Sequence, residues 1–206
     1  MSGPLVVPLG RRLAVYDLSL EHDPRAAQAF VQLAGQTVQL GGAALHLWDA
    51  AHRDGHGAED LARQWGLTDA DVDAGRSELR ALGAVSELTD TVDGRRTWAG
   101  AHTLHPLVLG LGEVADQPAA HHVGLPGRPV VQTTRAVRDV WAWGPLFGDL
   151  WTSVGWHAAG YAADGLPDPR AVDPDLLLAD VVAVLPALLQ TTAAYVDLAL
   201  PAAGAA

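Results

Sequence analysis

Alternating and periodic apolar positions divide the first hundred residues into short strands followed by helices. Three segments have strand-like composition, residues 12–18, 29–33 and 37–40, and Gly35 with Gln36 suits a hairpin turn between the last two. A helix is expected over residues 41–52, because apolar side chains recur there at spacings of three and four. The face that it would bury consists of Ala44, Leu47, Trp48 and Ala51.

The next segments are predicted to form a helix-turn-helix. The first helix spans residues 58–65 and is stopped by Gly66, after which Thr68 can accept an amide hydrogen bond as a helix cap. The second helix, residues 69–82, ends at Gly83, because glycine adopts a left-handed conformation at little energetic cost. Its apolar stripe consists of Val72, Leu79 and Leu82.

A β-hairpin wing is expected after the second helix. Residues 84–88 and 97–99 flank Asp93 and Gly94, a dipeptide that is strongly associated with two-residue hairpin turns. Strands, helices and wing in this order are typical of winged-helix domains.

This pattern resembles the PqqD-like winged-helix modules, also called RiPP recognition elements, from about residue 29 to residue 88. The resemblance depends on short stretches in the strand and helix segments. They are Val38-Gln39-Leu40-Gly41, Leu45-His46-Leu47-Trp48-Asp49, Asp54-Gly55, the helix of residues 58–65, Gly66-Leu67-Thr68 and Leu79-Arg80-Ala81-Leu82-Gly83-Ala84-Val85. Similar spacings occur in MarR-like and other winged-helix transcription factors, so these stretches leave a regulator open as an alternative. The second half of the chain resembles no family that we can name.

The resemblance implies a mechanism of peptide binding. Modules of this family bind the leader of a precursor peptide, which adds a strand to the free edge of the sheet and places its side chains against the third helix. Arg76 and Arg80, four residues apart, could pair with an acidic residue of such a peptide. The implied peptide-binding residues are Thr37, Val38, Gln39 and Leu40 on the edge strand, and Val72, Asp73, Arg76, Leu79 and Arg80 on the helix.

Charge argues against a nucleic-acid partner. The chain carries a formal net charge of −11, and residues 58–83 hold six acids against three arginines. Since phosphate neutralisation supplies most non-specific DNA affinity, a reading helix that starts with Asp69, Asp71 and Asp73 should be repelled by DNA. Arg95 and Arg96 in the expected wing are the opposing observation.

Composition excludes several further classes. The absence of cysteine excludes disulfides, zinc-thiolate sites and thiol nucleophiles, and the absence of lysine excludes Schiff-base chemistry on the chain. The N-terminus does not match a secretory signal, and the longest apolar stretch, residues 176–189, contains Asp180 and Pro186 and is too short to span a bilayer. We therefore expect a cytoplasmic protein without a membrane partner.

The second half, from about residue 101, is expected to be a mainly helical docking domain. Residues 134–143, 146–156 and 173–200 match helices, the last kinked by Pro186, whereas residues 100–130 are rich in glycine and proline. Four tryptophans there are expected either in the core or in a patch that docks a partner: Trp141, Trp143, Trp151 and Trp156.

No catalytic constellation is visible in the sequence. Histidines invite a metal hypothesis, but their spacing matches no known metal motif, so we expect surface or capping roles and no cofactor: His102, His105, His121 and His122. The sequence thus predicts a non-catalytic adaptor that binds a precursor peptide and presents it to a peptide-modifying enzyme. The alternative is a winged-helix transcriptional regulator whose C-terminal domain dimerises or binds an effector.

Overall fold

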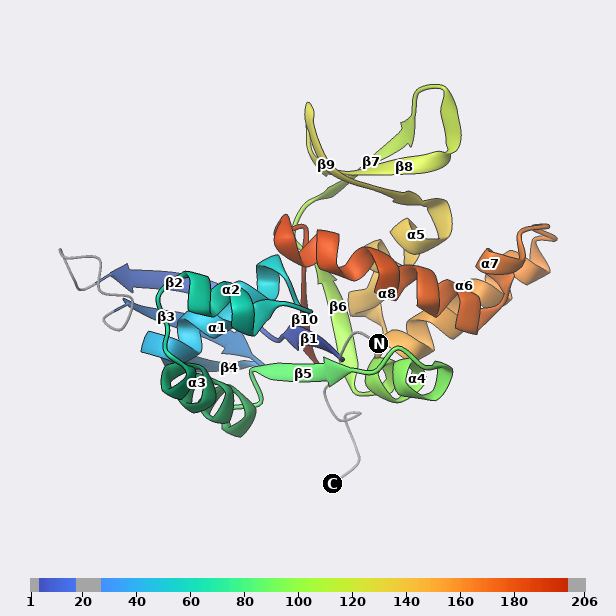
Figure 1. The fold of residues 1–206 in the computed structure, drawn as a ribbon. Helices are drawn as coiled ribbons and strands as arrows, with labels where there is room; N and C mark the ends of the chain where they lie inside the picture. Colours follow the sequence, from blue (N-terminus) through green and yellow to red (C-terminus); the bar gives the residue numbers. More distant parts are fainter. Residues whose placement is uncertain (1–3, 18–26, 200–206) are drawn as a thin grey trace. The chain divides into compact units, whose positions relative to one another are not determined.

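The computed structural model describes residues 4–17 and 27–199, which divide into two compact units. The first unit ends at Thr89 and includes Val196–Leu198, and the second runs from Asp90 to Tyr195. The described chain is a mixed α+β fold with eight α-helices and several small antiparallel sheets (Figure 1), so the predicted α+β class is confirmed. The roles assigned to residues 1–100 and 101–206, peptide recognition and docking, stay predictions.

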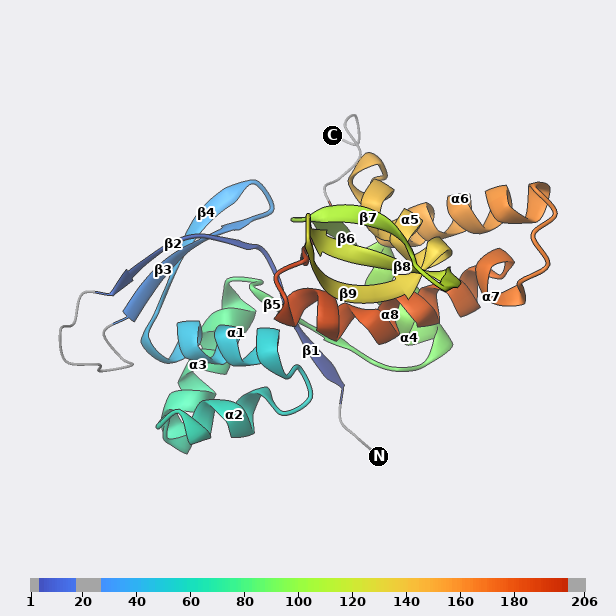
Figure 2. The ribbon, with the colours of Figure 1, turned by 90° about the horizontal axis from the view of Figure 1, so that it is seen from above.

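The first unit contains a three-stranded antiparallel sheet in the order β2-β3-β4 (Figure 2). The predicted strands are confirmed, although Leu18, the expected end of the first, lies outside the described residues. The turn between the last two strands is Ala34-Gly35, one residue before the predicted Gly35-Gln36, and its φ angles of 49° and 77° match the twist of the strands it joins. The strands are β2 (Arg11–Asp17), β3 (Ala27–Leu33) and β4 (Gln36–Gly41).

Three helices follow the sheet in the first unit, as predicted. Gly66 has a φ of 97°, and Thr68 caps α3 reciprocally: its hydroxyl accepts from Asp71 N–H, while the Asp71 carboxylate accepts from Thr68 N–H. Val72 and Leu79 are fully buried, but Leu82 is 37% exposed and does not belong to the core. The helices are α1 (Gly42–Arg53), α2 (Ala58–Gln64) and α3 (Asp69–Ala81).

Helix α3 packs closely on the start of α1 at Gly75. A Cβ atom at this position would lie 2.9 Å from the carbonyl carbon of Ala43 and 3.1 Å from the amide nitrogen of Ala44. Both neighbours are backbone atoms, so a side chain would push the two helices apart. Glycine is therefore needed here for the approach of the helices rather than for a turn.

The predicted wing is wrong. Residues 85–88 do form a strand, β5 (Val85–Leu88), but it pairs antiparallel with β1 (Leu5–Pro8) instead of with residues 97–99. Residues 92–100 form helix α4 (Val92–Gly100), because the Thr91 hydroxyl accepts from Gly94 N–H and caps it. The helix buries Trp98, so capping and core burial together override the hairpin preference of Asp-Gly.

Helices are present in the three predicted regions of the second half, but the one expected over residues 146–156 spans residues 150–163. Thr134 caps α5, and α6 begins at Leu150 because the Asp149 carboxylate accepts from Thr152 N–H. Asp173 caps α8, which continues through Pro186 but ends at Gln190, before the predicted end at Leu200, itself outside the described residues. The elements are α5 (Arg135–Trp143), the 3₁₀ turn η1 (Gly144–Leu146), α6 (Leu150–Ala163), α7 (Pro169–Val172) and α8 (Pro174–Gln190).

The second half is mostly helical but also contains strands that the sequence prediction missed. The glycine- and proline-rich segment forms an antiparallel sheet in the order β7-β8-β9. Pro126 and Gly127, interpreted as breakers, form the turn between β8 and β9, with Gly127 at a φ of 74°. The strands are β6 (His102–Pro106), which pairs with β10 (Ala194–Leu198), and β7 (Leu109–Val114), β8 (Gln117–Leu125) and β9 (Arg128–Thr134). None of the described helices combines the length and apolar composition that a membrane span requires.

A methyl group at residue 75 tests the packing of α3 on α1. Gly75→Ala should lower the free energy of unfolding by roughly 1–3 kcal/mol, because the new Cβ overlaps backbone that cannot move aside. Gly155→Ala is the matched control: this helical glycine of α6 has no atom near its missing Cβ, so the change should stabilise by about 0.5–1 kcal/mol. Urea unfolding followed by circular dichroism measures both, and equal effects of the two substitutions would contradict the close approach.

Candidate functional site

Strand β4 forms one edge of the sheet in the first unit. It pairs with β3 on one side, and no strand of the described chain pairs with its other side. The register places Leu33 opposite Gln36 beside the two-residue turn, and this pair exchanges both backbone hydrogen bonds in such a hairpin. Hydrogen bonding then alternates along the strand, so the backbone N–H and C=O groups of Val38 and Leu40 also point toward β3.

The backbone groups of Thr37 and Gln39 consequently point away from β3, toward the outer edge. Their side chains are exposed, whereas Leu40 is fully buried and Val38 is half-buried on the opposite face. The Gln39 side-chain amide donates to the Gln28 side chain of β3 over 2.8 Å. The edge therefore offers the N–H and C=O groups of two residues to an incoming strand.

The predicted helical half of the site contributes to a cavity that β4 does not line. Arg76, Leu79 and Arg80 line a cavity of about 480 Å³ together with residues of α1, α2, β1 and β5, and no residue of β4 lines it. Inside this unit Arg76 is ion-paired with Glu59, and Arg80 with Glu87. The structure therefore does not bring the two arginines and the edge strand into one pocket.

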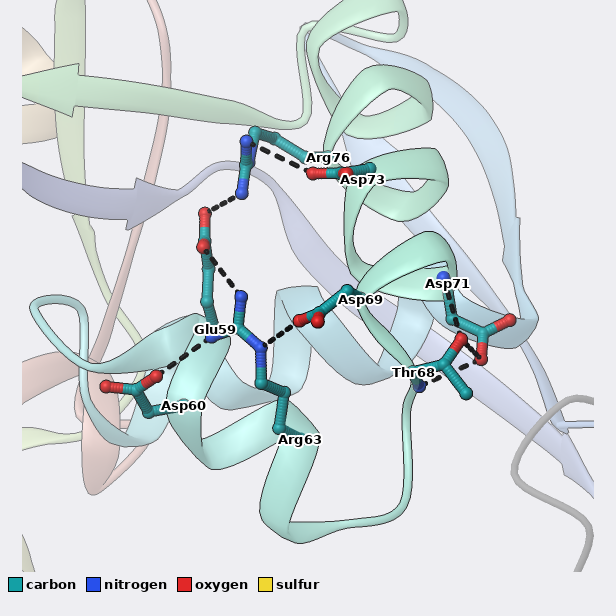
Figure 3. Close-up of polar contacts among 8 residues, drawn as sticks. All are labelled: Glu59, Asp60, Arg63, Thr68, Asp69, Asp71, Asp73 and Arg76. Carbon is teal, nitrogen blue, oxygen red and sulfur yellow. Dashed lines mark hydrogen bonds and ion pairs between the residues drawn. The ribbon is translucent and has the colours of Figure 1, made fainter.

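An ion-pair network connects α2 and α3 (Figure 3). Arg63 bonds to Asp60 over 2.8 Å and to Asp69 over 2.7 Å, and it lies 3.6 Å from Glu59. The hydrogen bond from Arg63 to Asp69 raises the pKa of the arginine. Exposed pairs of this kind contribute little stability individually. Their consequence here is that Arg63 is already occupied by carboxylates of its own unit.

The other α3 residues of the predicted site, Val72 and Asp73, make contacts within the first unit. Val72 is in the core with Leu79, and Asp73 lies 3.5 Å from Arg76 in the same network. Asp71 projects from the side of α3 away from Arg76, where it caps the helix with Thr68 (Figure 3). The side of α3 that carries the arginines is thus occupied by internal ion pairs.

The histidines considered as metal ligands are dispersed. His102 stacks on Trp98, and His105 stacks on Tyr195. His121 is buried, and this burial lowers its pKa, while His122 is its neighbour on β8 and so faces the other side of the strand. Among the described residues no three histidine or acidic side chains are grouped closely enough to hold a metal ion.

The four tryptophans of the predicted docking patch have different environments. Trp141 is buried and donates from its indole to the Ala193 carbonyl over 3.3 Å. Trp151 is half-buried, with the Arg96 guanidinium 5.5 Å from its ring centre. Trp143 and Trp156 are 55% and 63% exposed. Only the last two of the four present large surfaces to solvent.

Those two tryptophans line a cavity of about 590 Å³ in the second unit. Sequence reasoning missed the cavity because its walls come from α5, η1 and α6. The wall includes His157, which follows Ser153 by one helical turn. The sequence shows this spacing but does not reveal that the His157 side chain is buried.

Comparisons with known proteins gave no matching family model, no matching curated protein and no matching solved structure.

Amide exchange in the free protein tests the assignment of the edge. Thr37 and Gln39 should exchange their amide hydrogens much faster than Val38 and Leu40, because only the latter two donate to β3. Hydrogen–deuterium exchange followed by NMR resolves the four amides individually. Equal protection along β4 would mean that its outer side is already hydrogen-bonded.

Proposed function

We propose that this protein is a non-catalytic adaptor that binds an extended segment of a precursor peptide along the outer edge of β4. It would present that peptide to a modifying enzyme in the cytoplasm, where the precursor is made. The observation that carries the proposal is the position of β4: it ends its sheet, with the backbone of Thr37 and Gln39 directed outward.

The order of elements supports the proposal. Three strands, β2 to β4, precede three helices, α1 to α3, which is the order that the resemblance to PqqD-like modules implies. A peptide that adds a strand to this edge would gain affinity from the backbone, because each backbone hydrogen bond contributes about 1 kcal/mol net. Two outward residues could supply up to four such bonds.

In this proposal Arg76 and Arg80 contribute less to the choice of peptide than the sequence suggested. An acidic peptide residue would have to displace Glu59 from Arg76 or Glu87 from Arg80. Both arginines also line a cavity to which β4 does not contribute. The proposal therefore depends on pairing of the backbone along β4, with side-chain preferences as a second contribution.

A transcriptional regulator is the second candidate, favoured by the helix-turn-helix of α2 and α3. Its difficulty is electrostatic. The three arginines of residues 58–83 all bond to carboxylates of the same unit: Arg63, Arg76 and Arg80. The hairpin wing that would have supplied further cations is helix α4 instead. We propose peptide rather than DNA on this basis.

DNA affinity as a function of salt discriminates between the two candidates. The adaptor should bind a fluorescent duplex of random sequence weakly at every salt concentration, with a nearly flat plot of log affinity against log salt. A regulator that neutralises six phosphates would lose roughly a thousandfold in affinity between 50 and 200 mM salt. Fluorescence anisotropy measures this slope, and a steep negative value would favour the regulator.

The second unit is proposed to engage the modifying enzyme. Trp143 and Trp156 are available for such a contact, and Trp151 is partly available, whereas Trp141 is committed to the core. The part of the patch that supports docking is therefore the pair of exposed tryptophans.

A proline at residue 37 tests capture by the edge. Linear peptides selected from a random display library on the immobilised protein serve as the probe. Thr37→Pro removes one outward N–H and should weaken binding of a selected peptide about fivefold to tenfold, through the loss of one backbone hydrogen bond. Thr37→Ala keeps that N–H and should bind the peptide like the original protein. Isothermal titration calorimetry gives the affinities.

Val38→Pro is the structural control for the same experiment. Its N–H faces β3, so this change should break the β3–β4 pairing and lower the melting temperature, which Thr37→Pro should leave nearly unchanged. The proposal is wrong if no peptide is enriched, or if the enriched peptides bind the Thr37→Pro and Thr37→Ala variants equally well.

A further inference from the structure

The second unit has an aromatic cavity lined by Trp143 and Trp156, the two side chains proposed above for docking of the enzyme, and peptide capture along β4 does not use it. Its volume is about 590 Å³, within the range of small-molecule sites, and it lies among α5, η1 and α6. Its apolar wall includes three of the most exposed large side chains of the described chain, at 55%, 75% and 63% exposure: Trp143, Leu146 and Trp156. Large apolar side chains gathered around a cavity mark a contact site.

The polar atom that identifies the ligand belongs to His157. This side chain is 5% exposed and lines the cavity, with the rings of Trp156 and Phe147 at centroid distances of 5.0 and 5.8 Å. Its Nδ1 lies 2.8 Å from the Ser153 carbonyl, which can only accept, so Nδ1 carries the proton. In the neutral ring Nε2 is then an acceptor, and it has no hydrogen-bond partner among the described residues.

The charged groups of the cavity are balanced. Arg135, Arg138, Asp139 and Asp164 all line it. Asp139 forms ion pairs with Arg138, over 2.7 Å, and with Arg135, over 3.8 Å, and it accepts a hydrogen bond from the Tyr161 hydroxyl. Burial and this bond to Asp139 raise the pKa of Tyr161, so the phenol stays protonated. A cavity with two charges of each sign favours a neutral ligand over an ion.

From these contacts we infer that the cavity binds a neutral aromatic ring that carries a hydrogen-bond donor, such as a phenol or an indole. The ring packs between the tryptophans, and its O–H or N–H donates to Nε2 of His157. Nε2 is buried, and the rings of Phe147 and Trp156 lie beside the imidazole, so the ligand reaches this atom when one of these two side chains changes rotamer. The ring can belong to a small molecule or to a tyrosine or tryptophan side chain of a polypeptide.

The test compares p-cresol with toluene, which has the same ring and methyl group but no donor. The full-length protein should bind p-cresol about tenfold more tightly than toluene, and p-cresol alone should shift the ¹⁵N resonance of His157 Nε2. His157→Phe keeps a ring in the wall but removes the acceptor, so the preference should fall to about one. Equal binding of the two ligands to the unsubstituted protein, or no binding of either, overturns the inference. So does a preference that survives in His157→Phe.

A second variant keeps the test valid if His157→Phe does not fold. Trp156→Ala removes an exposed wall and should weaken p-cresol and toluene alike, whereas Leu109→Ala, 57% exposed but not part of the cavity, should change neither. Unchanged binding in Trp156→Ala overturns the inference.

N-acetyl-tyrosinamide distinguishes the two sources of the aromatic ring. Its competition with p-cresol supports a polypeptide side chain, and its exclusion from the cavity supports a small molecule. None of these measurements involves β4, so they succeed or fail independently of peptide capture.

Discussion

The alternation of hydrogen bonds along the β3–β4 hairpin determines what the first unit can offer to a partner. A two-residue turn sets the register, and the register directs the backbone of Thr37 and Gln39 outward. A slip of one residue would turn Leu40, now fully buried, toward solvent and exchange the roles of Thr37 and Val38. Burial of one leucine and the chemistry of the turn therefore fix the same edge that we propose as the peptide site.

The charges of α2 and α3 also limit which partners the first unit can bind. The acids of α2 and α3 do not form a uniform negative surface, because Glu59, Asp60 and Asp69 form ion pairs with arginines of the same unit. The same bonds occupy the cations that DNA would need. Pairing within the unit thus weakens both the nucleic-acid interpretation and the idea that Arg76 recognises an acidic peptide residue. Backbone pairing at the sheet edge involves none of these charges.

Local signals in the sequence predicted most of the first unit, and contacts between distant segments explain what they missed. Thr68 was recognisable as a cap because its hydrogen bond is to a residue three positions away. The wing was wrong because β5 pairs with β1, about 80 residues earlier, a partner that no local pattern indicates. The edge strand of the candidate site was predictable from its strand-like composition and the turn signal before it. The ion pair between Arg80 and Glu87, and the burial of His157, depend on tertiary packing and leave no mark in the spacing of residues.

The most direct test of the account is a crystal or NMR structure of the protein with a selected peptide bound. The account predicts that the peptide forms a fourth strand beside β4, with hydrogen bonds to the N–H and C=O groups of Thr37 and Gln39. A peptide bound away from β4, or an outer edge already paired with the protein's own chain, would contradict it.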